Sequence, residues 1–530
     1  MLRRIATQSA LVLAAVTGAQ AVQAQSLAVQ CPRVTTMHPT AQSLTNTNQL
    51  RVDTAHPGFI KCQEIAGTDG FATMADGNQL YTFGFGALSG IKDILLGQAG
   101  TQPETVFNST YTGPVAYSDV ASSQAAVTTT SWTNVNDVLP NNGNNRRVTS
   151  SANAGVIEPA MMMNLGTLGA MMPAPEIAVD EDDELFLTLS NTGQIMRPDL
   201  FEQHTVHWHG YPNASSYFDG VPDASVSINI AGSFTYYYRV NDAGTYFWHC
   251  HITPPEHLQM GMVGQLFVRP RQNRVVAGTS LSSALVTNNA KAPKVPGWTS
   301  TNNPSASNGC SDILCTGQTP VPATTAAVNA VAGGKYAYND GDASTRYDVE
   351  YPIQIMGFDP NFHFVGMTFN PEPFVDMKDK YYVLNGRGYP DTVGGDAGTA
   401  GVLSAEGSDA VRRASQPLPS VINIPAGKKA LLRLSNLSVT EYSTLGTIGI
   451  PMHVIGVHAR LLRDTAGGDM SYYTNSVTMG GGESMDVMLD ATDTTAYPAG
   501  SVFFLYSKNL DHLSNDAENF GGQMTEIRIN

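Results

Sequence analysis

Hydrophobic and polar positions alternate with a period of two along several short stretches of this chain. That alternation is typical of half-buried β-strands, and helical periodicity is scarce. We therefore predict an all-β protein. The clearest strands are expected in residues 75–86, EIAVDEDDELFLTLSN, SINIAGSFTYYYRV and GQLFVRP, and later in YYVLNGRGYPDT, SVINIPAGKKALLRLSNLS, PMHVIGVHARLLRD, GGGESMDVMLD and FFLYSKNLDHL.

These strands form two groups, separated by a stretch dense in Ser, Thr, Ala, Asn and Pro. A chain of 530 residues is also too long for one core of ordinary size. We predict two Greek-key β-sandwiches in tandem. The expected divisions are a signal peptide (1–24), an irregular N-terminal segment (25–72), a first domain (73–272, with a loop excursion over about 91–155), a linker (273–345) and a second domain (346–530).

The N-terminus carries Arg3 and Arg4 before a short apolar run, and then small residues that suit a signal peptidase. We expect a periplasmic or secreted protein that has no membrane span once this leader is cleaved. The net charge of −16 argues against nucleic acid and anionic membranes as partners.

Five cysteines in an exported chain leave one without a partner. In an oxidising compartment Cys31 can pair with Cys62, and Cys310 with Cys315. Cys250 is then a free thiol, and it lies between His249 and His251. A free thiol with two histidine neighbours indicates metal chemistry.

Half of the twelve histidines lie between residues 204 and 257, in HTVHWHG and in FWHCHITPPEHLQMGM. Side chains two apart on a strand share a face, whereas odd spacings oppose one another. One face therefore collects Cys250 and His204. The other face collects His207, His209, His249 and His251.

The first face predicts a blue copper site, with His257 and Met262 added to His204 and Cys250. A thiolate, two imidazoles and a weak axial thioether are the ligands of such electron-transfer centres. Zinc is the alternative metal, but zinc sites rarely use methionine and carry no electrons. The four histidines of the other face predict a second copper centre, joined to the first through the backbone of Cys250.

HTVHWHG and WHCHI, followed by His257 and Gly261-Met262, resemble the copper motifs of the multicopper oxidases, a family of cupredoxin-domain enzymes. The resemblance also covers PAPEIAVDEDDELFLTLSN, NGRGYPDT and GGGESMDVMLD. It implies cupredoxin-like domains and an oxidase that passes single electrons from a small-molecule or metal-ion substrate, through type 1 copper, to a cluster that reduces dioxygen. The implied type 1 ligands are His204, Cys250, His257 and Met262, and the four other histidines are half of the eight that hold type 2 and type 3 copper.

The second domain departs from the family pattern. No other His-x-His pair exists in the chain, and Tyr506-Ser507-Lys508 stands where the family has a second His-Cys-His. The second domain is therefore expected to hold no type 1 copper. The histidines that remain as candidates there are His453 and His512 as metal ligands and His458 as a catalytic residue.

The spacing from Cys250 to His257 is two residues longer than is usual in these oxidases. In this spacing, and in the segment HVIGVH, the chain resembles the two-domain copper nitrite reductases, in which a neighbour in a trimer completes the catalytic copper site. A nitrite-reductase-like enzyme is thus one alternative, with a homotrimer as its implied assembly. A non-enzymatic type 1 electron carrier or copper-binding protein is the other.

Methionines are concentrated in MMMNLGTLGAMM, between Met161 and Met172. Thioethers bind Cu(I), so a surface patch of them would accept cuprous ions. The favoured interpretation is an apolar filler ahead of the strand that begins near Glu176.

Overall fold

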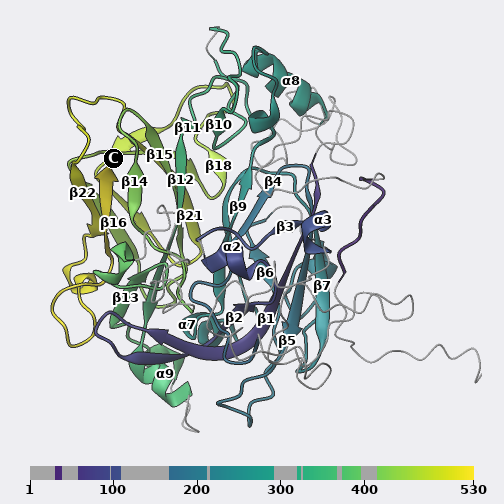
Figure 1. Cartoon of the computed structure of the whole chain (residues 1–530), viewed down its shortest axis with the longest axis vertical. Helices are drawn as coiled ribbons and strands as arrows, with labels where there is room; N and C mark the ends of the chain where they lie inside the picture. The colour runs from purple at the N-terminus through teal and green to yellow at the C-terminus, as the bar shows by residue number, and fades with distance from the viewer. Residues whose placement is uncertain are drawn as a thin grey trace, which may run out of the picture.

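A computed structural model of the chain describes residues 30–38, 58–95, 97–108, 166–211, 215–291, 319–323, 326–366, 373–394 and 415–530. These residues form two β-sandwiches side by side, and the all-β prediction is confirmed (Figure 1). The predicted signal peptide, most of the loop excursion, the Cys310–Cys315 pair and Met161–Met163 lie outside the described residues. Among the described helices, none has the length and apolar character needed to cross a membrane.

The first sandwich consists of two sheets. One has the order β2 (Gln79–Ala87), β1 (Ile60–Thr73), β5 (Glu184–Asn191) and β7 (Ser233–Arg239), with β3 (Gln102–Pro103) on β1. The other has the order β4 (Ile177–Asp180), β9 (Val263–Arg269), β8 (Gly244–His249) and β6 (His207–His209). Alternate residues of β5 are fully buried against Trp208 and Trp248 of the facing sheet, so the alternation builds the core.

The expectation of an irregular segment over 25–72 is wrong for its last part, because β1 is a strand of 14 residues there. It pairs with β2 on one side and with β5 on the other, and it is buried along nearly its whole length. The polar residues of β1 interrupt the alternation of hydrophobic and polar positions, so the sequence pattern did not predict this strand. Lys61, for example, is buried but lies 2.8 Å from both Asp180 and Asp183. Near its start, Cys62 forms the predicted disulfide with Cys31.

The second sandwich repeats this plan. One sheet has the order β13 (Tyr381–Leu384), β12 (Val349–Phe358), β15 (Lys429–Asn436), β21 (Glu483–Asp490), β17 (Met452–Val457) and β18 (Arg460–Leu461), with β19 (Tyr472–Thr474) on β17. The other has the order β14 (Ile422–Ile424), β23 (Met524–Ile529), β22 (Val502–Ser507), β16 (Ser443–Ile448) and β20 (Ser476–Met479). In each sandwich the first strand of each sheet runs parallel to a later one: β1 to β5, β4 to β9, β12 to β15 and β14 to β23.

Short helices lie between the strands. They are α2 (Ile91–Leu95), α3 (Glu104–Phe107), α7 (Pro254–Gln259), α8 (Leu281–Lys291) and α9 (Pro360–Gly366), with 3-10 turns η5 (Ser216–Phe218), η6 (Arg271–Arg274), η7 (Phe374–Asp376), η8 (Asp391–Val393) and η9 (Leu510–Leu513). The segment predicted as a linker (273–345) thus contains α8 and β10 (Lys335–Tyr336). The latter pairs with β11 (Arg346–Tyr347), which lies at the start of the predicted second domain.

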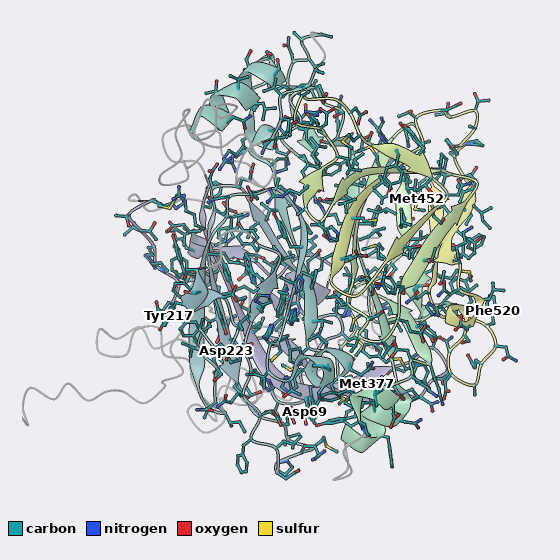
Figure 2. The ribbon with its side chains drawn as sticks, turned by 180° about the vertical axis from the view of Figure 1, so that it is seen from behind. Asp69, Tyr217, Asp223, Met377, Met452 and Phe520 are labelled. Carbon is teal, nitrogen blue, oxygen red and sulfur yellow. A yellow bond between two sulfur atoms is a disulfide. The ribbon has the colours of Figure 1, made fainter. Side chains whose placement is uncertain are left out.

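The two sandwiches are joined by both apolar and polar contacts. One buried apolar cluster combines Phe247 and Val263 of the first with Phe358 and Leu437 of the second. Met377 of the second sandwich packs against the core of the first, and Figure 2 labels it low on the boundary between the two ribbons. The second sandwich therefore packs against the outer face of the sheet that carries β8, next to the strand end where the histidines and Cys250 lie.

Candidate metal centres

Four elements bring the predicted thiolate site together. Cys250 follows directly after β8, His204 precedes β6 and forms a bridge to Ile228, and His257 lies on α7. Met262 comes directly before β9, and its carbonyl oxygen accepts a hydrogen bond from the Cys250 N–H at 3.1 Å. The four ligand candidates are all fully buried.

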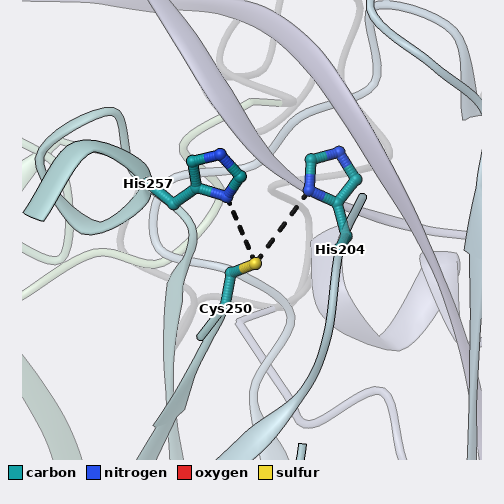
Figure 3. Close-up of side chains that lie close together, drawn as sticks. All are labelled: His204, Cys250 and His257. Carbon is teal, nitrogen blue, oxygen red and sulfur yellow. Dashed lines mark hydrogen bonds between the residues drawn. The ribbon is translucent and has the colours of Figure 1, made fainter. Parts of the chain in front are cut away.

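Both imidazoles point their Nδ1 atoms at the sulfur (Figure 3). The Sγ atom of Cys250 lies 3.2 Å from His257 Nδ1 and 4.0 Å from His204 Nδ1. The backbone N–H of Thr205 also donates to this sulfur, at 3.4 Å. On the far side of the ring, His257 Nε2 lies 3.6 Å from a carboxylate oxygen of Glu202. Glu202 was not singled out from the sequence, although it stands only two residues before His204.

The charges at this site favour the thiolate. Burial alone raises the pKa of Cys250, but the charges and hydrogen bonds of His257 and His204 outweigh it and hold the pKa well below its usual range. Burial lowers the pKa of His257, whereas Cys250 and Glu202 raise it, to a net value of about 10. The thiolate is the form in which cysteine binds a metal.

These residues fit a copper ion. Nitrogen and sulfur ligands bind first-row metals at about 2.0 and 2.3 Å, which places two of them roughly 3.5 Å apart around one ion. The two observed sulfur-to-nitrogen distances, 3.2 and 4.0 Å, lie on either side of that value. A buried thiolate, two imidazoles and a buried methionine are the donor set of a blue copper site.

The opposite face of the same strand ends carries the four remaining histidines. His207 and His249 pair directly across β6 and β8, and His209 Nδ1 lies 3.3 Å from His249 Nε2. One ligand atom from each of His207, His209 and His249 lies within 4.8 Å of the others. The ring of His251 lies 5.1 Å from that of His207. The structure thus groups the histidines as the strand alternation predicts.

Backbone carbonyls orient two of these rings. The Nδ1 atom of His207 donates to the carbonyl of Asp219 at 2.7 Å, and that of His249 to the carbonyl of Cys250 at 2.8 Å. In both residues Nε2 is left for a metal, as is usual for histidine ligands. Burial lowers the pKa of His249 to about 3 and that of His209 to about 4, so both rings are neutral near pH 7. Neutral imidazole is the form that binds metal.

A cleft of about 440 Å³ opens beside His209 and His249. Its other wall belongs to the second sandwich and includes Glu441 and Glu483. Gly482 faces the His209 ring, and a β-carbon there would lie 3.7 Å from His209 Nε2. The cleft is therefore shared between the two sandwiches. Neither glutamate was singled out from the sequence, because nothing in the strand pattern shows which wall faces the histidines.

The three candidate histidines of the second sandwich occupy different places. His458 Nε2 lies 3.7 Å from Glu483, and His512 Nε2 lies 2.9 Å from Glu441, so each backs a carboxylate of the cleft wall. His512 is fully buried and stacks on Tyr382. His453 is not among the residues that line the cleft. It stacks on Tyr473 and bonds Ser471.

The described end of the methionine-rich segment is interior. Met171 and Met172 are 9% and 2% exposed, and Met172 belongs to the apolar cluster between the sandwiches. These two side chains therefore contribute packing rather than an exposed thioether patch.

Comparison with known proteins assigns the part of the chain that carries both sites. Residues 152–273 match the family described as multicopper oxidase. Multicopper oxidase MCE of Talaromyces pinophilus is 30% identical over 119 residues, and multicopper oxidase MmcO of Mycobacterium tuberculosis is 34% identical over 86 residues. These matches cover 22% and 16% of this chain, and the chain spans only 18% and 16% of those relatives.

Among solved structures, the blue copper oxidase of Nitrosomonas europaea is similar over 88% of this chain and 85% of its own, at 15% identity and a TM-score of 0.46. Because this likeness is distant, the description of the fold rests on the strands and their pairing and not on this similarity. The assignment depends instead on the match over 152–273, which contains every ligand candidate of the first sandwich. Residues 152–273 are therefore similar to a multicopper oxidase domain, and this likeness covers the part of the chain that carries both candidate sites.

Proposed function

We propose that this protein is an exported oxidoreductase that moves single electrons from a reducing substrate to dioxygen. His204, Cys250, His257 and Met262 would hold type 1 copper. Further copper, of type 2 or type 3, would be held by His207, His209, His249 and His251. One observation carries the proposal: Cys250 belongs to the buried thiolate site, while both residues bonded to it in the chain belong to the histidine cluster.

When bound, copper supplies one-electron redox chemistry by cycling between Cu(I) and Cu(II). The protein supplies the route. His257 is fully buried, but its Nε2 atom faces Glu202, whose side chain is 26% exposed. The Glu202 surface is therefore where a reducing substrate would approach. From Cys250, the covalent backbone leads directly to His249 and His251.

Reduction of dioxygen to water consumes protons, and side chains at the cleft wall can donate them. The half-buried imidazole of His209 and the buried imidazole of His249 are neutral near pH 7, since desolvation lowers their pKa values to about 4 and about 3. Glu441 and Glu483 line the opposite wall, and His512 and His458 contact them. We assign these two carboxylate–imidazole pairs to proton delivery. On this proposal His458 and His512 act through glutamates, and His453 has no part.

A nitrite-reductase-like enzyme is the second candidate, and the second sandwich favours it in one respect. The sequence has no second His-x-His pair, and His458 and His512 are separate residues that contact Glu483 and Glu441 of the cleft wall. So few histidines in the second sandwich suit a single further copper better than a complete trinuclear cluster. In a homotrimer, a neighbouring chain would provide what is missing.

Copper content separates these candidates. About four coppers per chain in replete protein support the oxidase, about two the reductase, and one blue copper alone an electron carrier or copper-binding protein. Dioxygen uptake with phenols, ferrous, manganous or cuprous ions then tests the substrate. In the oxidase, His209→Ala should abolish turnover and leave the blue absorption unchanged. Turnover retained in that variant would contradict the proposal.

Export to the periplasm or the cell exterior is part of the same proposal. Its support is the Cys31–Cys62 disulfide, because such bonds persist in oxidising compartments. Cell fractionation and the N-terminal sequence of the mature protein test it directly. A protein found in the cytosol with residues 1–24 still attached would contradict it.

A further inference from the structure

Gln259 lies in the loop that carries the thiolate-site ligands, two residues after His257 and three before Met262. Its side chain is 1% exposed, and its amide bonds to residues of the second sandwich. The amide NH2 donates to Asp379 Oδ1 at 3.0 Å, and the amide oxygen accepts from the backbone N–H of Asp359 at 2.9 Å. One glutamine thus ties the ligand loop to the other sandwich at two points.

His363, on α9 of the second sandwich, adds a third point. Its Nε2 atom lies 2.9 Å from the carbonyl oxygen of Gln259, and its Nδ1 atom lies 2.5 Å from that of Tyr81 on β2. From the same strand, Phe83 packs edge-on against the ring of His257, at 5.9 Å between ring centroids. His363 therefore contacts both elements that flank the His257 side of the thiolate site, and Figure 1 shows α9 below α7 and β2.

Gln259 and His363 together form a clamp between the ligand loop and the second sandwich. The residues of the second sandwich that bond Gln259 are themselves held in place. Asp359 accepts backbone hydrogen bonds from Asn361 at 2.8 Å and from Lys378 at 2.7 Å. Asp379 accepts a bond from the Thr440 hydroxyl at 2.5 Å. A β-carbon at Gly357 would lie 2.2 Å from Asp379 Oδ2, so a side chain there would displace that carboxylate. The second sandwich presents a rigid surface to the loop.

The helix within the ligand loop adds little stability of its own. The α7 helix has only six residues, its Thr253 N-cap makes no side-chain capping bond, and a helix this short is marginal without tertiary contacts. Phe362 of α9 completes the packing, because it belongs to the same buried cluster as Met260 and Met262. Both the polar and the apolar support of the loop therefore include residues of the second sandwich.

We infer that the second sandwich, which has no thiolate site of its own, positions the ligand loop of the first through Gln259 and His363. Both are positioning residues: they hold His257 and Met262 at the distances that the site requires. The inference rests on the proposed type 1 site for its functional meaning. Partners of metal ligands typically change metal affinity by about 10- to 100-fold when they are removed.

Gln259→Leu tests the clamp, and the chain offers a closely matched control. Gln272 is also buried, and its amide likewise donates to an aspartate, Asp340, and accepts from a backbone N–H, that of Gly341. Hydrogen exchange of copper-free protein should be at least about 10-fold faster over residues 254–262 in Gln259→Leu, and unchanged there in Gln272→Leu. Unchanged exchange in Gln259→Leu, or an equal effect of Gln272→Leu, would overturn the inference.

His363→Phe provides an independent variant, should Gln259→Leu fail to fold. It should speed exchange over the same residues and over β2 near Tyr81. In copper-loaded protein, both variants should bind Cu(II) about 10- to 100-fold more weakly and shift the thiolate absorption band, whereas Gln272→Leu should do neither. A wild-type protein without any blue band would refute the proposed type 1 site, and the exchange experiment would still decide whether the second sandwich holds the loop.

Discussion

The two candidate metal centres share one strand end but differ in nearly every physical respect. The thiolate site is enclosed, because His204, Cys250, His257 and Met262 are all fully buried. The histidine cluster is open, since it borders a cleft of about 440 Å³ whose far wall belongs to another sandwich. An electron-transfer site gains from rigid enclosure, whereas a site that must admit a substrate needs an opening.

The two centres also differ in charge. In the thiolate site, attraction between Cys250 and His257 moves the two pKa values in opposite directions, that of the thiol down and that of the imidazole to about 10. In the cluster, burial lowers the pKa of His249 to about 3 without an opposing carboxylate. At the end of β8, one face therefore carries a charged site with a soft sulfur ligand, and the other face carries a neutral site of nitrogen ligands.

The largest expected effect is the loss of one centre without the other. In Cys250→Ser the soft thiolate is replaced by a poor ligand, so the blue absorption should vanish and the copper content should fall by one ion per chain. Copper in the histidine cluster should remain, because its ligands lie on the opposite face. Copper analysis together with electron paramagnetic resonance measures both. Loss of all copper would show that the two centres are not separate.

A smaller effect concerns acid stability, which should depend on the cluster. Between pH 6.5 and about 3 the unfolded chain binds a proton at His249 that the folded chain does not. The folded state therefore loses stability as the pH falls through this window, by about 1.4 kcal/mol per pH unit for this residue.

Urea unfolding of copper-free protein from pH 7 to pH 4.5 measures that slope. His249→Gln can still donate to the Cys250 carbonyl but cannot titrate, so its slope should be shallower by about one proton. Equal slopes in the two proteins would mean that His249 is protonated in the folded state. Such a result would remove the contrast in charge between the two centres.

The smallest effect is expected at the cleft wall. His458 is 54% exposed, and its pair with Glu483 spans 3.7 Å, so His458→Ala should change the free energy of unfolding by less than about 1 kcal/mol. Turnover should fall by less than about 10²-fold, since the Glu441–His512 pair remains as a second donor. His453→Ala, outside the cleft lining, should leave turnover unchanged. Equal losses in both variants would argue against a role for the cleft wall.

Local patterns predicted much of the first sandwich. Strand alternation placed His204 with Cys250, and His207, His209, His249 and His251 together on the other face, because a period of two is a property of the strand itself. It failed at β1, where buried charges such as Lys61 interrupt the alternation and ion pairs with distant aspartates compensate for their burial.

The amino-acid sequence alone determined the all-β class, the free thiol at position 250 and the division of the ligand candidates between two faces, since each depends on residues close together in the chain. The packing of the two sandwiches decided the rest. Only it shows that Glu441 and Glu483 face the histidine cluster, and that Gln259 is held by Asp359, His363 and Asp379. These partners lie 100 or more residues from Gln259, and no local pattern specifies which distant surfaces meet.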